Sequence, residues 1–146
     1  MSRSIEREIR IAAAPDVVYQ VISSPEHLRE WWPDEADLDA TPGATGTIGF
    51  RQADSTMYQS LTVVEADPPR RFSIRWAYDG DAATVQNSVL ATFDLVPHDG
   101  GTLLRFAETG FDEANWSEEA YQDHVTGWNY FLPRLAPYAE RQVARP

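Results

Sequence analysis

Two titratable side chains are placed by the sequence pattern toward the protein interior. Glu108 shares one face of a predicted strand with Leu104 and Phe106, and His124 precedes Trp128 by one turn of a predicted helix. A buried carboxylate must be paired or protonated, and a histidine can exchange protons near neutral pH. Glu108 and His124 are therefore the candidates for an acid and a base, or for groups that orient a ligand hydroxyl or amine.

Both residues also have structural explanations. Glu108 could pair with an inward arginine or a tyrosine hydroxyl, or lie at an open end in water, and Arg7 is a possible partner because it follows Ile5 at strand spacing. His124 could be a structural histidine or one at the solvent edge. An enzyme would need polar groups that converge in a cavity, and Tyr78 is the third residue that could join them.

Other catalytic and metal-binding patterns are missing from the sequence. The chain has no cysteine and only three histidines, whose spacing does not match a zinc site. It also lacks a G-x-S-x-G motif, a phosphate-binding glycine loop and a dinucleotide fingerprint. We therefore predict no metal and no cofactor.

Charge and hydropathy narrow the classes of partner. The formal net charge is −11 and all twelve basic residues are arginine, so that nucleic acid or an anionic membrane surface would repel the chain. No segment approaches the roughly 18–20 apolar residues of a membrane span, and the N-terminus has no apolar signal segment. We expect a cytoplasmic protein that neither binds nucleic acid nor inserts into a membrane.

Alternation of apolar and polar residues predicts most of the strands. The predicted strands are 4–11, a segment containing Ile48 and Phe50, 57–66, 71–78, 85–96 and 102–109. His98-Asp99-Gly100-Gly101 predicts a hairpin turn between the last two.

Helical spacing marks three other segments. Short helices are predicted after Pro15 and after Ser24, the second ending near Pro33. A long helix with a broad apolar stripe follows Asn115, which resembles a capping residue with Glu118 three positions later. Pro133 and Pro137 fall inside this helix, and we predict a bend near Asn129–Pro133.

Together these elements predict an α+β fold. Consecutive strands with short turns favour an antiparallel meander, and the long helix has the apolar face needed to cover it. We expect a curved sheet of about six to seven strands around the C-terminal helix, in one domain spanning residues 1–146.

Large aromatic side chains on the inward faces predict an apolar cavity between sheet and helix. Solid core is the alternative, above all for Phe93. Of Trp31 and Trp32, we expect one in the core and the other near the cavity mouth, and the alternative is that both are core through a break at Pro33. The predicted ligand-binding residues are Trp32, Phe50, Trp76, Tyr78, Phe93, Phe106, Glu108, His124, Trp128 and Phe131.

Several local strings resemble the START-like (SRPBCC, birch-pollen-allergen-like) superfamily, and within it the activator of heat-shock-protein ATPase homologue-like family. They extend from about residue 5 to residue 140. The strings are Ala14-Pro15-Asp16-Val17-Val18-Tyr19, Ser24-Pro25-Glu26-His27-Leu28, Trp31-Trp32, Val64 to Arg71, Trp76, Gly101 to Leu104, Thr109-Gly110-Phe111 and Gly127-Trp128.

The resemblance implies a helix-grip fold and leaves the function open, because the superfamily includes lipid carriers, polyketide cyclases, hormone receptors and co-chaperones. Our first hypothesis is binding of a small hydrophobic or amphipathic molecule without catalysis. The alternatives are an enzyme of the polyketide cyclase or dehydratase type, and a co-chaperone-like interaction protein. A homodimer through a strand edge or the Trp-rich mouth is also possible.

Overall fold

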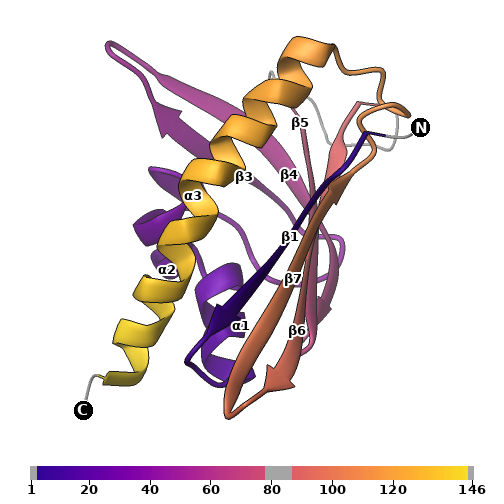
Figure 1. The fold of residues 1–146 in the computed structure, drawn as a ribbon. Coiled ribbons are helices and arrows are strands. Elements are labelled where there is room, and N and C mark those ends of the chain that lie inside the picture. Colours follow the sequence, from indigo (N-terminus) through magenta and orange to yellow (C-terminus); the bar gives the residue numbers. More distant parts are fainter. Residues whose placement is uncertain (1–2, 78–86, 145–146) are drawn as a thin grey trace.

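The computed structural model describes residues 3–77 and 87–144. Within these ranges it contains seven strands and three helices, which confirms the α+β helix-grip fold (Figure 1). The elements are β1 (Ile5–Ile11), α1 (Pro15–Ser23), α2 (Pro25–Trp31), β2 (Glu35–Asp37), β3 (Thr45–Arg51), β4 (Thr56–Asp67), β5 (Arg71–Ala77), β6 (Val89–His98), β7 (Gly101–Thr109) and α3 (Glu118–Ala144).

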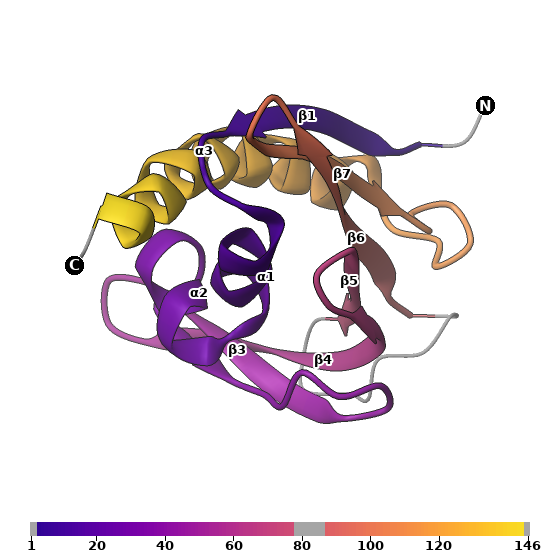
Figure 2. The same cartoon turned by 90° about the horizontal axis from the view of Figure 1, so that it is seen from below.

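The seven strands form one antiparallel sheet in the order β1-β7-β6-β5-β4-β3-β2. Strands β2 to β7 therefore form a meander, and β1 pairs with β7 at the edge of the sheet opposite β2. The pairing of β4 with β5 shifts between Val63 and Glu65, an irregularity of the kind that bends a strand. The sheet curves around α1 and α2, and α3 runs beside β1 (Figure 2).

The hairpin predicted at His98 to Gly101 is confirmed. Asp99 and Gly100 have φ angles of 50° and 80° and connect β6 directly to β7. A two-residue turn with positive φ at both positions matches the twist of the strands that it joins. By contrast, β2 was not predicted, because its three residues are too few to show an alternation of apolar and polar side chains.

Helix α3 begins later than its predicted cap. The Ser117 hydroxyl accepts a hydrogen bond from the amide of Ala120 at 3.1 Å, so Ser117 is the capping residue. Asn115 instead has a φ of 56° in the preceding loop, and the predicted capping role of Asn115 is wrong. The helix continues through Pro133 and Pro137 to Ala144, and the bend near Asn129–Pro133 stays a prediction.

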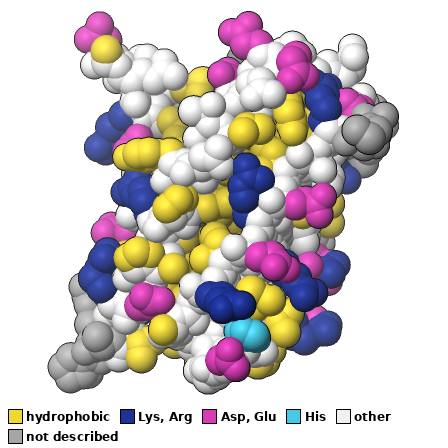
Figure 3. Space-filling model, viewed as in Figure 1, with side chains coloured by type: hydrophobic (Ala, Val, Ile, Leu, Met, Phe, Trp, Pro, Cys, Tyr) yellow, Lys and Arg dark blue, Asp and Glu magenta, His cyan; other side chains and the backbone are white. Residues whose placement is uncertain are grey.

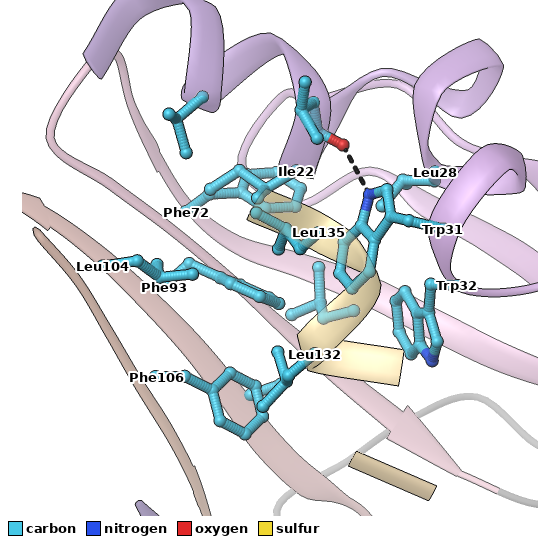
Figure 4. Close-up of a cluster of buried hydrophobic side chains, with 14 of the residues drawn as sticks. Ile22, Leu28, Trp31, Trp32, Phe72, Phe93, Leu104, Phe106, Leu132 and Leu135 are labelled. Carbon is cyan, nitrogen blue, oxygen red and sulfur yellow. Dashed lines mark hydrogen bonds between the residues drawn. The ribbon is translucent and has the colours of Figure 1, made fainter. Parts of the chain in front are cut away.

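The core lies between the short helices, α3 and the concave face of the sheet. Trp31 is completely buried and donates its indole N–H to the carbonyl of Val21 at 2.9 Å. Figure 4 shows its ring among Ile22, Leu28 and Leu135, with Trp32 beside it. Trp32 follows the last residue of α2 with φ −124° and ψ −97°, and this break in the helix lets adjacent tryptophans both point inward.

The N-terminal segment is attached to the loop before α3. The carboxylate of Asp112 accepts hydrogen bonds from the Arg3 amide at 2.8 Å and from its guanidinium at 2.7 Å. The amide and then the guanidinium lower the pKa of Asp112 below its ordinary value.

This pair predicts a small acid-dependent contribution to stability. Because the folded pKa of Asp112 is lowered, its contribution is present above the ordinary aspartate pKa of about 3.9 and is lost as pH falls through the folded pKa. We expect wild type to be more stable than Asp112→Asn at neutral pH, with a difference that shrinks below about pH 4. Urea unfolding at several pH values measures this difference, and a constant difference would contradict the prediction.

No helix within the described ranges is long and apolar enough to span a membrane.

Candidate functional site

A cavity of about 550 Å³ lies between strands β3 to β5 and the N-terminal half of α3. Its volume falls within the range of pockets that hold small molecules. The described residues that line it are Trp32, Phe50, Gln52, Met57, Gln59, Trp76, Ser117, Glu119, Ala120, Asp123, His124, Gly127, Trp128 and Phe131.

Directly behind the wall of this cavity lies Glu108, whose side chain is fully buried. Its Oε2 atom accepts the indole N–H of Trp76 at 2.6 Å, and its Oε1 atom accepts that of Trp128 at 2.9 Å. The Nδ1 atom of His124 lies 2.7 Å from Oε1. We assign the tautomer of His124 that carries its hydrogen on Nδ1, in which the imidazole donates to Oε1. Three ring donors therefore converge on one carboxylate.

Three elements, β5, β7 and α3, bring this cluster together. Glu108 lies on β7 and pairs with Ile5 of β1 and Ala91 of β6. Trp76 lies near the end of β5, while His124 and Trp128 stand one turn apart on α3. The cluster thus connects α3 to strands β5 and β7. Its hydrogen bonds hold in place the rings that face the cavity.

Further contacts between aromatic rings extend the wall of the cavity. The centroid of Trp32 lies 5.0 Å from that of Trp128 and 5.2 Å from that of Trp76, and the His124 ring lies 4.6 Å from Trp76. Phe50 of β3 approaches Phe131 of α3 at 5.9 Å. Such geometries suit aromatic pairs, and they form a continuous aromatic surface on one side of the cavity.

The structure brings most of the predicted ligand-binding residues to this cavity. The predicted residues in its lining are Trp32, Phe50, Trp76, His124, Trp128 and Phe131. Glu108 is behind the wall rather than in it. Phe93 and Phe106 pack against each other at 5.1 Å, and Phe106 packs against Trp128 at 4.5 Å. These two phenylalanines are core and do not belong to the described lining, which corrects their placement. Tyr78 lies outside the described residues.

The partner suggested for Glu108 is wrong. Arg7 donates to the side chain of Asn129 at 3.0 Å and to the carbonyl of Glu6 at 2.8 Å. It is half exposed at the outer side of α3, while the carboxylate of Glu108 is reached by ring N–H groups from β5 and α3. The arginine head group stays in water, where its charge costs least.

Sequence reasoning also missed the polar part of the lining. Gln59 is 3% exposed, and within residues 3–77 and 87–144 its Oε1 atom has no hydrogen-bond partner. It precedes the inward Leu61 and Val63 at strand spacing, and this alternation was an available signal. Glu119 and Asp123 are exposed and lie four residues apart on α3, a spacing that places them on one helix face.

Within the described ranges, no group of three or more His, Asp or Glu side chains is placed to hold a metal ion. The cavity instead combines aromatic walls with a few polar groups, the arrangement typical of sites for small organic molecules.

Comparison with solved structures gives the same fold. A protein of Mesorhizobium loti, MLL2253, has a TM-score of 0.77 at 23% identity over 95% of this chain and 98% of its own. The Aha1 dimer of Colwellia psychrerythraea has a TM-score of 0.71 at 24% identity, over 94% and 96% of the two chains. DynU16, from the dynemicin biosynthetic locus, has a TM-score of 0.74 at 19% identity, over 94% of this chain and 47% of its own.

At these identities the solved structures show similarity of fold. A comparison with curated protein sequences finds no significant match. A model of one sequence family, described as activator of Hsp90 ATPase homolog 1-like protein, matches residues 12–140. This match includes both short helices and all but the last turn of α3. The chain therefore belongs to the activator of Hsp90 ATPase homolog 1-like family of the START-like superfamily.

Proposed function

We propose that this protein binds a small hydrophobic or amphipathic molecule in the cavity between strands β3 to β5 and α3. The observation that carries the proposal is the cavity itself, about 550 Å³ in volume with a wall of packed aromatic rings. Burial of apolar ligand surface against these rings would supply the affinity.

The arrangement of Glu108 favours binding over catalysis. A catalytic carboxylate must reach the proton that it takes or gives, but the side chain of Glu108 is fully buried and accepts from three rings. Its role in this proposal is to hold Trp76, His124 and Trp128 in place. A preorganised wall lowers the entropy cost of binding.

Membership of the family also leaves room for association with protein partners. The relative from Colwellia psychrerythraea is described as a dimer, which supports a homodimer as a further prediction for this chain. A co-chaperone role is ranked after ligand binding, because the cavity gives ligand binding a specific structural basis.

Gly127 provides a test that separates binding from folding. A Cβ atom at this position of α3 would meet only the ring of Phe131 among the described residues, at 3.9 Å. In Gly127→Leu, the added side chain would occupy the cavity, while leucine favours helix over glycine by about 0.5–1 kcal/mol. We expect probe affinity to fall at least about tenfold with stability unchanged or raised.

The measurement uses naphthylmethanol as a neutral probe, followed by quenching of tryptophan fluorescence, and chemical unfolding of each variant. Gly127→Ala is the matched control, because it gives the helix a methyl group and leaves most of the cavity open. Native mass spectrometry of protein purified from its own source would reveal a bound natural ligand. Equal probe binding by wild type and Gly127→Leu would contradict the proposal.

A further inference from the structure

The polar groups at this cavity differ in one respect from those of a general hydrophobic pocket. Among the described lining residues there are two carboxylates, Glu119 and Asp123, and no arginine. The chain has no lysine at all. Asp and Glu side chains also gather at the top of the face seen in Figure 3, over the N-terminal end of α3.

The strongest N–H donors of the wall are turned away from the cavity. The indole N–H groups of Trp76 and Trp128 are both used by Glu108. His124 directs Nδ1 to the same carboxylate. The remaining side-chain donors of the described lining are neutral, namely the indole of Trp32, the amides of Gln52 and Gln59 and the hydroxyl of Ser117. Trp76 and Trp128 therefore offer the cavity their ring surfaces, which attract cations.

Gln59 adds an independent observation inside the cavity. Its side chain comes from β4 and is almost completely buried, yet its Oε1 atom has no hydrogen-bond partner among the residues that the structure describes. An unsatisfied buried acceptor is costly. A ligand that donates an N–H or O–H to this oxygen would remove that cost.

These observations narrow the chemical class of the ligand. They are the two carboxylates at the cavity edge, Glu119 and Asp123 (the acidic rim), the ring surfaces of Trp76 and Trp128, and the unpaired Oε1 atom of Gln59. We propose that the cavity takes an aromatic or otherwise apolar amine, whose ammonium group is attracted by Glu119 and Asp123 and donates to Gln59. This inference rests on the proposed function and adds the chemical class of the ligand. A carboxylate-bearing ligand of equal size would meet repulsion from the rim and could not donate to Gln59 in its ionised form.

Three probes with the same ring system test the head group. Naphthylmethylamine is a cation at neutral pH, naphthylmethanol is neutral, and naphthoic acid is an anion. We expect the amine to bind wild-type protein about tenfold more tightly than the alcohol, and the acid to bind most weakly. Isothermal titration calorimetry at a fixed, moderate salt concentration measures all three affinities.

Substitutions then locate the preference. The double variant Glu119→Gln, Asp123→Asn should lose several-fold affinity for the amine and little for the alcohol. Asp99→Asn removes a charge at the distant β6–β7 turn (Figure 1) and tolerates its positive φ, so it should leave both affinities unchanged. Gln59→Met keeps the side-chain length and should weaken both donor probes.

The outcomes test the inferred class of ligand separately from the proposed function. If the alcohol or the acid binds as tightly as the amine, the inferred class of ligand is wrong while the cavity still binds hydrophobic molecules. If none of the three probes binds, the proposed function fails and the inference fails with it. An amine preference that Asp99→Asn reduces as much as the rim variant would assign the effect to overall charge and overturn the inference.

Discussion

Replacing Glu108 with leucine is expected to lower the free energy of unfolding by about 3–6 kcal/mol, a large part of the stability of an ordinary domain. The substitution removes the common acceptor of three buried donors, on Trp76, His124 and Trp128. Leaving each donor unsatisfied costs about 1–3 kcal/mol, and the apolar surface gained by leucine offsets only part of this.

Glu108→Gln separates the loss of hydrogen bonds from the change of shape. One amide oxygen can replace Oε1 and accept from Trp128 and His124, but the amino group then faces the indole N–H of Trp76 across 2.6 Å. Turning the amide over places the amino group against the other two donors. We therefore expect a loss of about 2 kcal/mol even for this isosteric change.

A double-mutant cycle tests whether the amide group introduced by Glu108→Gln opposes the indole N–H of Trp76. Trp76→Phe removes the indole donor, so it should cost less in the Glu108→Gln background than in wild type, by about 1 kcal/mol or more. Guanidinium-induced unfolding measures each variant, and Glu119→Gln is the control for loss of an exposed charge, with an expected effect within about 0.5 kcal/mol. A Glu108→Gln protein as stable as wild type would show that Glu108 does not organise this wall.

The inward direction of Glu108 was predictable, but its partners were not. Alternation along one strand gives the direction of a side chain. The partners come from Trp76 on β5 and from His124 and Trp128 on α3, and only the assembled sheet brings these segments together. The sequence analysis offered an inward arginine or a tyrosine hydroxyl as the partner of Glu108, because a buried carboxylate must be paired, whereas here ring N–H groups take that place.

The sequence pattern also could not predict which inward aromatic side chains are core and which line the cavity. Phe106 and Trp76 both alternate inward, yet Phe106 packs against Trp128 in the core while Trp76 reaches the cavity. A period of two separates the faces of a sheet but does not tell where the space between sheet and helix is filled. Similarly, Asn115 and Ser117 both suit a helix cap, and the loop geometry selected Ser117.

Helix α3 carries a second large expected effect, of opposite sign. Pro133 and Pro137 are both exposed and lie one turn apart inside the helix. Proline has no amide hydrogen, so the carbonyls of Asn129 and Pro133 lack their usual helical donors. Proline costs about 3 kcal/mol relative to alanine inside a helix. Exposure to water and the stiffer unfolded chain recover part of this cost.

We therefore expect Pro133→Ala and Pro137→Ala each to raise the free energy of unfolding by about 1–2 kcal/mol, and the double variant to gain less than the sum because the two sites share one turn. Urea unfolding measures the gain, and hydrogen exchange of the alanine amides shows whether the missing bonds form. Thr126→Ala, at an exposed position of α3, is the control for alanine propensity. A loss of stability would mean that α3 packs against the sheet only in the shape that the prolines impose.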